Sequence, residues 1–318
     1  MAVKIWLLII FGFFVLDLTA QTTLIQGKVA DQNGQPLYLT LVYNADLGIG
    51  AYTDERGFFF IESDKVIPEL EVFALGYMRE RVNTKVDSSF ITIKLKKLIY
   101  DLKEIEIHPC PKSEITMGLD LESIEHNLMR LSPTHGFNYQ VGMSFPTRYG
   151  QEITAVEVHA INPGIRRTTF RLRIFELDSS GMPGNDLLLE NLIVSVPGLR
   201  NKRPTLIDLK DYNLRSPDSG IFVAVEWLPM ENNTYRTTGR HPSGSRGKRH
   251  TTLPILRLIR TEKNPDFKMW RKRDEGEWYQ THPQIKKKWL ELNPHLASKE
   301  DQELTNFPAI KVHLLDCE

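Results

Sequence analysis

Turn-forming residues recur about every ten residues along much of the chain, and the runs between them are short and rich in β-branched and aromatic residues. Near the N-terminus, turns at 31–36 and 52–57 separate apolar runs at 24–29 and 58–61. These runs are shorter than the roughly 8 to 20 residues of an ordinary helix. Short strands with regular turn signals are typical of sandwiches and barrels. The spacing therefore predicts an all-β protein.

The first predicted module is a small β-sandwich. Its candidate strands are the apolar runs 24–29, 39–43, 58–61, 70–74, 82–86 and 90–95. Gly57 follows Asp54 in one of the turns, and we expect it to supply the positive φ that a tight hairpin turn needs. These residues are expected to build a fold and to carry no reactive group.

Several motifs occur in order over about residues 23–97. They are Gly27-Lys28-Val29, Gly34-Gln35-Pro36-Leu37, Thr53-Asp54-Glu55-x-Gly57-x-Phe59 and Gly76-Tyr77. Together they resemble the carboxypeptidase-regulatory-like domain, and Gly50-Ala51 departs slightly from the Gly-Thr common in that family. The resemblance implies a seven-stranded, transthyretin-like β-sandwich without catalytic residues. In Gram-negative bacteria the family often precedes outer-membrane transporters or occurs in other envelope proteins. Too few residues follow here for a transporter barrel.

The first twenty residues read as a signal peptide. Lys4 gives a positive start, residues 5–16 are apolar, and Leu18-Thr19-Ala20 offers small residues before a cleavage point. The apolar run is shorter than the roughly 20 residues of a membrane span, although an uncleaved anchor remains the alternative. The sequence therefore predicts export to the periplasm, the outer membrane or the cell surface.

The expected organisation is a signal peptide at 1–20, the first sandwich at 21–97, a linker at 98–131 with a short helix at 120–131, and a larger jelly-roll-like sandwich at 132–318. The helix is predicted from apolar residues at helical spacing, from Leu121 to Leu131.

The larger module is predicted from a second series of candidate strands. They are 139–145, 153–161, 169–177, 192–196, 205–209, 220–228, 255–259 and 309–315. Residues 221–227 are apolar at almost every position, which indicates a central strand covered on both faces. The pattern Phe170-x-Leu172-x-Ile174 followed by Gly181-x-Pro183-Gly184 resembles ligand-binding sandwiches of envelope proteins, including carbohydrate-binding types.

Composition gives no global electrostatic signal. Lys plus Arg (40) balance Asp plus Glu (40), so a nucleic-acid partner is not expected from overall charge. Cys110 and Cys317 lack the spacing of a metal pair. In an oxidising compartment they could form a disulfide, but sequence separation does not decide whether they meet.

Searches for catalytic motifs find none. The zinc carboxypeptidase pattern needs a His followed three residues later by Glu, and only His313 with Asp316 comes near it. A nucleophile elbow and a phosphate loop are also absent from the sequence. No catalytic residue, metal site or cofactor is predicted. The alternative is an exported, glycan-acting hydrolase whose carboxylate pair joins Glu226 with Asp178 or Glu176 in the larger module.

The candidate ligand-binding residues lie in a basic, Gly/Ser-rich loop and in the segment after it. They are Arg236, Arg240, Arg246, Arg249, Trp270, Trp278 and Tyr279. Arginine binds phosphate, sulfate or carboxylate, and aromatic rings stack on sugars or cations. We therefore expect a non-enzymatic protein that binds an anionic glycan, an outer-membrane component or another envelope protein. A solvated loop with buried aromatic rings is the alternative. A third hypothesis is a structural adaptor that docks through a sheet edge of the first module.

Overall fold

The computed structural model describes residues 23–84, 90–98, 112–119, 129–131, 139–162, 167–198, 203–228, 230–240, 246–262, 266–273, 276–280 and 304–317. These residues form strands, and their only helical elements are the single-turn 3-10 helices η1 (Lys210–Tyr212) and η2 (Glu231–Asn233). The prediction of an all-β protein is confirmed. The chain divides into two compact units: a first unit of Met1–Ala74 with Met78–Lys96, and a second unit of Leu75–Tyr77 with Lys97–Glu318.

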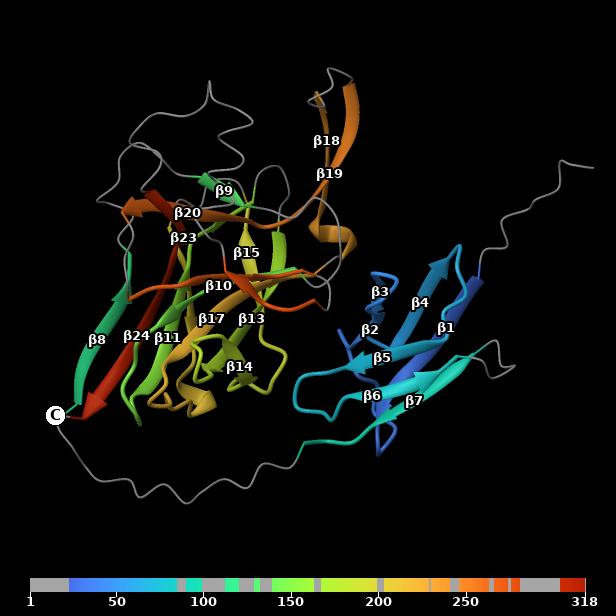
Figure 1. Ribbon diagram of the computed structural model, residues 1–318, viewed down its shortest axis with the longest axis horizontal. Helices are drawn as coiled ribbons and strands as arrows, with labels where there is room; N and C mark the ends of the chain where they lie inside the picture. The colour runs from blue at the N-terminus through green and yellow to red at the C-terminus, as the bar shows by residue number, and fades with distance from the viewer. Residues whose placement is uncertain are drawn as a thin grey trace, which may run out of the picture. The chain divides into compact units, whose positions relative to one another are not determined.

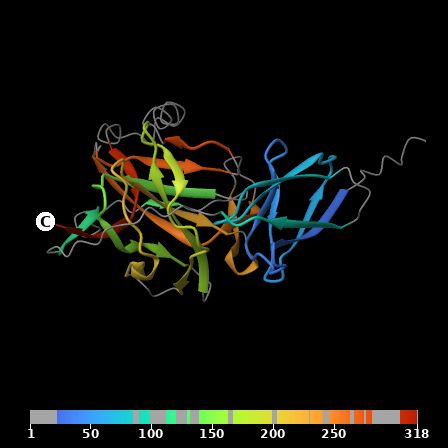
Figure 2. The same cartoon turned by 90° about the horizontal axis from the view of Figure 1, so that it is seen from below.

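The described strands of the first unit form two sheets (Figures 1 and 2). One sheet has the order β4-β1-β7, made of β4 (Phe58–Ser63), β1 (Thr23–Asp31) and β7 (Ile91–Leu95). The other has the order β3-β2-β5-β6, made of β3 (Ile49–Tyr52), β2 (Leu41–Asn44), β5 (Glu69–Phe73) and β6 (Glu80–Asn83). Strand β1 pairs antiparallel with β4 and parallel with β7.

Strand alternation gives the first unit its apolar core, because successive side chains point to opposite faces. On β4, Phe59 is 1% exposed and Ile61 is 3% exposed, whereas Phe60 between them is 60% exposed. Leu70 and Val72 of β5 contribute buried side chains from the other sheet. The transthyretin-like assignment of this unit stays a prediction.

The turn before β4 has the conformation that the sequence predicts. The Asp54 carboxylate accepts hydrogen bonds from the backbone N–H groups of Arg56 (2.9 Å) and Phe58 (2.8 Å). Gly57 has a φ of 80°, and a Cβ there would lie only 2.4 Å from the Val29 carbonyl oxygen. Glycine is therefore needed both for its backbone conformation and for the close approach of β1.

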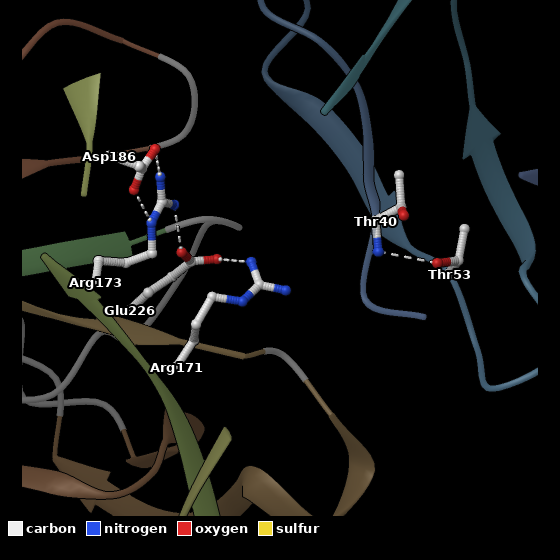
Figure 3. Close-up of polar contacts among 6 residues, drawn as sticks. All are labelled: Thr40, Thr53, Arg171, Arg173, Asp186 and Glu226. Carbon is white, nitrogen blue, oxygen red and sulfur yellow. Dashed lines mark hydrogen bonds and ion pairs between the residues drawn. The ribbon is translucent and has the colours of Figure 1, made fainter. Parts of the chain in front are cut away.

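The preceding threonine fixes this turn to the neighbouring loop. The Thr53 hydroxyl accepts a hydrogen bond from the Thr40 backbone N–H at 2.9 Å, as Figure 3 shows, and donates to the Leu37 carbonyl at 2.5 Å. Turns capped in the same way by an aspartate recur after Asp31 and Asp178. The aspartate recurs because its side chain satisfies backbone donors within its own turn.

The larger sheet of the second unit has the order β14-β13-β17-β10-β21-β22, with β15 also pairing with β13. These strands are β14 (Pro183–Asp186), β13 (Arg167–Leu177), β17 (Ile221–Trp227), β10 (Tyr139–Phe145), β21 (Met269–Lys272), β22 (Tyr279–Gln280) and β15 (Ile193–Pro197). Every residue of β17 is buried, and β13 and β10 flank it along its whole length. The prediction of a central strand at 221–227 is confirmed.

Two further sheets share an apolar core with the larger one. The first has the order β16-β11-β24-β8, made of β16 (Thr205–Asp208), β11 (Glu152–Val158), β24 (Ile310–Cys317) and β8 (Lys112–Gly118). The second has the order β12-β20-β23 with β9 beside β20, made of β12 (Ala160–Ile161), β20 (Ile255–Glu262), β23 (Leu304–Pro308) and β9 (Met129–Leu131). Leu172 and Val223 of the larger sheet and Val156, Leu258 and Val312 of the other two belong to this core. The second unit is therefore a β-sandwich.

The segment 98–131 is not the simple linker that the sequence suggests. Strand β8 pairs with the C-terminal strand β24, and β9 pairs with β20, so both belong to the second unit. At 129–131, where the end of a helix was expected, the chain is extended, with Leu131 opposite Leu256. The helix prediction is wrong there because apolar spacing reports only local periodicity, whereas sheet pairing is decided by distant residues.

Other predictions concern parts of the chain outside the described residues. They include the signal peptide at 1–20, the remainder of the helix at 120–128 and Cys110. Cys317 is described, and it lies opposite Lys112 at the end of the β8–β24 pair. The disulfide stays a prediction.

Candidate functional site

The basic segment predicted as a loop contains two strands. β18 (Thr234–Arg240) and β19 (Arg246–Thr252) pair antiparallel with each other and form a sheet of their own among the described residues. Figure 1 shows this hairpin, coloured orange, as a ribbon that extends beyond the other strands of the second unit. The prediction of a loop was wrong because its Gly, Ser and Arg residues carry little apolar alternation, the main sequence signal of a strand.

The register of this ribbon sorts the predicted arginines by face. Arg240 is opposite Arg246, Thr238 is opposite Lys248, and Arg236 is opposite His250. Because strand positions alternate between faces, these cross-strand pairs all occupy positions of one face. We call these positions the basic face.

Arg249 is opposite Thr237, so its position belongs to the other face. Three of the four predicted arginines are therefore brought together, and the fourth is separated from them. Like charges directly opposite each other on a ribbon are destabilising by about 0.2–1 kcal/mol per pair. An anionic ligand on the basic face would offset this repulsion.

Of the predicted aromatic residues, Trp270 lies on β21, Trp278 just before β22 and Tyr279 on β22. The two tryptophans are packing residues. Trp270 is 9% exposed and lies in a buried cluster with Phe175 and Phe222. Trp278 packs edge-on against the same two rings, with ring centroids 5.6 and 5.1 Å apart. Trp270 and Trp278 are therefore used in packing. Tyr279 is the predicted aromatic residue with a large exposed fraction, 42%.

Tyr279 belongs to a small polar group at the end of the larger sheet. It is opposite Arg271 in the β21–β22 pair. Its hydroxyl and Arg271 both interact with Tyr139. Burial raises the pKa of the Tyr139 phenol, which keeps it neutral. Two phenol hydroxyls and one guanidinium group therefore lie close together at this end of the sheet.

A buried ionic cluster crosses the same sheet on the face away from the apolar core. The Glu226 carboxylate of β17 accepts hydrogen bonds at 2.8 Å from both Arg171 and Arg173 of β13. Arg173 also binds the Asp186 carboxylate through two hydrogen bonds of 2.8 and 2.7 Å (Figure 3). Arg171, Arg173 and Glu226 are each 3% exposed or less.

The electrostatics of this cluster indicate a structural role. Burial opposes the charge on Arg173, but the carboxylates of Asp186 and Glu226 outweigh it and raise the pKa of its guanidinium. Both oxygens of Glu226 are engaged by arginine, so this carboxylate is ill suited to give or take a proton.

Asp178 and Glu176, the carboxylates predicted to pair with Glu226 in a hydrolase, are also engaged in local hydrogen bonds. The Asp178 carboxylate accepts hydrogen bonds from Ser180 and from the Met182 backbone, and these bonds lower its pKa. The Glu176 carboxylate accepts a hydrogen bond from Asn185 at 2.5 Å. These contacts stabilise the turn after β13 and its neighbour β14.

Sequence reasoning missed a groove of about 290 Å³ on the sheet β16-β11-β24-β8. His313 of β24 lies in it, with Nε2 2.9 Å from Glu157 Oε1 of β11 and Nδ1 3.1 Å from Thr116 Oγ1 of β8. The acid that contacts His313 is thus Glu157, whereas Asp316 binds Arg148 and Gln151. These side chains come from strands far apart in the sequence, so no local motif could signal them.

No protein-family model and no curated protein matches the chain. In the ranges that the structure describes, no group of three or more His, Cys, Asp or Glu side chains could hold a metal ion. The helices of those ranges include none with the length and hydropathy of a membrane span.

Proposed function

We propose that this chain is an exported envelope protein whose second unit binds an anionic ligand through the basic face of the β18–β19 ribbon. The observation that carries the proposal is the register, which places Arg236, Arg240, Arg246 and Lys248 at positions of one face. Clustered phosphate, sulfate or carboxylate groups suit such a face because arginine binds them bidentately. Acidic glycans and phosphorylated outer-membrane head groups share this chemistry.

Export is supported by the N-terminal sequence pattern of Lys4, the apolar run 5–16 and the small residues before Gln21. The resemblance of the first unit to carboxypeptidase-regulatory-like domains supports an envelope protein. The two-sheet arrangement of its described strands agrees with a small sandwich. In this proposal the first unit is a scaffold and the ribbon is the binding element.

The test compares two substitutions of the same kind on opposite faces of the ribbon. Binding of the chain from Gln21 onwards is measured by calorimetry with dextran sulfate and with phosphorylated lipopolysaccharide, and neutral dextran is the blank. We expect Arg240→Gln to weaken binding about tenfold, since a charge-assisted hydrogen bond contributes roughly 1.5–3 kcal/mol. Arg249→Gln should weaken it much less.

Salt provides a second readout. Binding to the basic face should weaken as ionic strength rises, because counterions compete for the arginines. If Arg240→Gln and Arg249→Gln weakened binding equally, the binding would be unspecific charge attraction and the basic face would not be a site. Binding of neutral dextran as strong as that of dextran sulfate would reject an anion site altogether. The two anionic probes separate a sulfated polysaccharide from a phosphorylated head group.

A further inference from the structure

The first unit exposes large apolar side chains on the outer face of the sheet β4-β1-β7. Phe60 of β4 is 60% exposed, Leu24 of β1 is 53% exposed, and Phe90 just before β7 is 41% exposed. Single exposed apolar residues are ordinary on soluble proteins, whereas a contiguous group on one face marks a contact surface.

The register shows that these residues are neighbours. Phe60 is opposite Gln26 on β1, and the Gly27–Ile91 pair places Phe90 beside Gln26 on the other side of that strand. Phe58, two residues before Phe60 and therefore on the same face, packs edge-on against Phe90 with ring centroids 6.1 Å apart. We call Leu24, Phe58, Phe60 and Phe90 the aromatic face.

Positive charge lies within and beside the aromatic face. The Lys28 ammonium lies 5.6 Å from the centroid of the Phe58 ring. Lys94 and Lys96 of the β7 edge are exposed, and they alternate with buried Leu95. Glu62 is the acidic residue among the outward positions of these strands. The face therefore combines apolar side chains around Gln26 with a net positive charge from Lys28, Lys94 and Lys96.

The size of the face argues against a second copy of this chain as its occupant. Three strands about 4.8 Å apart and about five residues long cover roughly 250 Å². A stable dimer buries about 800 Å² on each partner. A bilayer makes no such demand, because inserted rings gain from contact with the acyl region and basic side chains are attracted to anionic head groups.

We propose that the aromatic face is a membrane-contact surface that inserts Phe60, Phe90 and Leu24 into an anionic phospholipid bilayer, with Lys28 and Lys94 against its head groups. This surface belongs to the first unit and is separate from the basic face of the ribbon. It would hold the exported protein at a membrane of the envelope while the second unit binds its ligand.

The test is co-sedimentation of the chain from Gln21 onwards with vesicles of phosphatidylethanolamine and phosphatidylglycerol. Since the ribbon also attracts anions, every variant is made in a background that carries Arg240→Gln and Arg246→Gln. In that background we expect Phe60→Ser and Phe90→Ser each to weaken vesicle binding about tenfold. Failure of the ribbon proposal leaves this result unaffected.

Two controls make the result specific. Val66 is 77% exposed but lies outside the sheet, and Val66→Ser should leave vesicle binding unchanged. Phe60→Trp should retain binding, and its fluorescence should be quenched by brominated lipid if the ring enters the bilayer. Lys28→Gln should weaken binding to anionic vesicles and have no effect on phosphatidylcholine vesicles.

Three outcomes would overturn the proposal. One is unchanged vesicle binding after Phe60→Ser and Phe90→Ser in folded protein, as judged by circular dichroism. Another is an equal loss with Val66→Ser. The third is loss of a co-purifying envelope protein with vesicle binding intact, which would identify the aromatic face as a protein-docking surface.

Discussion

The two units depart from the usual distribution of side chains in opposite directions. The sheet β4-β1-β7 of the first unit exposes phenylalanine on its outer face, with Phe60 60% accessible. The larger sheet of the second unit buries charge on the face away from its apolar core, with Arg171 and Glu226 at 2% and 1%. In both sheets the opposite face is apolar and buried, as strand alternation requires. The difference shows that the inner faces specify the fold, whereas the outer faces carry the unusual chemistry.

The largest expected effect comes from breaking the buried charge cluster. Glu226→Gln leaves Arg171 and Arg173 without their shared carboxylate, and we expect it to lower the free energy of unfolding by up to about 5 kcal/mol. Urea unfolding monitored by circular dichroism measures the loss. Glu190→Gln, at an exposed position of the same unit, should change stability by less than about 0.5 kcal/mol. A small effect of Glu226→Gln would mean that the cluster contributes little to stability.

Adjacent phenylalanines in the first unit give a matched pair. Phe59→Ala removes a 1% exposed ring from the core and should lower the free energy of unfolding by about 3 kcal/mol or more. Phe60→Ala removes the 60% exposed neighbour and should change it by less than about 0.5 kcal/mol. Thermal and urea unfolding of both variants provide the comparison. Similar losses for the two would show that Phe60 is part of the core.

A buried histidine makes the stability of the second unit depend on pH. His159 lies between β11 and β12, is 4% exposed, and its ring nitrogens have no hydrogen-bond partner among the described residues. Burial, with a smaller contribution from Arg257, lowers its pKa to about 4. Between about pH 6.5 and pH 4 the unfolded chain binds a proton that the folded chain does not, so stability falls as the pH drops through this window.

We expect this histidine to account for about 2–3 kcal/mol of the acid-side loss. Stability curves from pH 7 to pH 4 for wild type and His159→Leu measure the contribution, because the carboxylates titrate in both proteins. As the pH falls from 7 to 4, the wild type should lose about 2–3 kcal/mol more stability than His159→Leu. Parallel curves would contradict a depressed pKa at this position.

The smallest effect is expected at the ribbon, where the charges are predicted to repel each other across one strand pair. Arg246→Thr removes the like-charge pair with Arg240 and should stabilise the hairpin by about 0.2–1 kcal/mol without ligand. Hydrogen exchange of the β18 and β19 amides measures this local change. The same substitution should weaken binding of dextran sulfate. Slower exchange together with tighter binding would argue against the basic face as the binding surface.

The sequence predicted the elements whose signal is local. Residues 139–145 and 221–227 alternate or are apolar throughout, and both were recognised as strands with nearly correct bounds. The turn at Asp54 and Gly57 was also predicted, because aspartate capping and a positive φ are properties of four consecutive residues. Strand β18 was missed because its residues carry little apolar alternation. The extended residues 129–131 were missed because they pair with the distant strand β20, which a local pattern does not contain.

The same division applies to the candidate site. The concentration of arginine between 236 and 249 is visible in the sequence, and so is the tryptophan-rich segment after it. Register places Arg240 opposite Arg246 and puts Arg249 at a position of the other face. That Trp270 and Trp278 pack against Phe175 and Phe222, instead of offering a stacking surface, follows from strands that meet only in the folded chain.

By itself, then, the sequence determined the all-β class, the main turns and the strands with a strong apolar pattern, because hydrophobic alternation and turn chemistry act over a few residues. Tertiary structure alone decided which outward side chains are neighbours, and whether they are buried or exposed. Cross-strand pairing joins positions that are distant in the sequence, such as Arg171 with Glu226 and Gln26 with Phe60. The alternation of side chains along one strand does not depend on which strand it pairs with, so it does not reveal these neighbours.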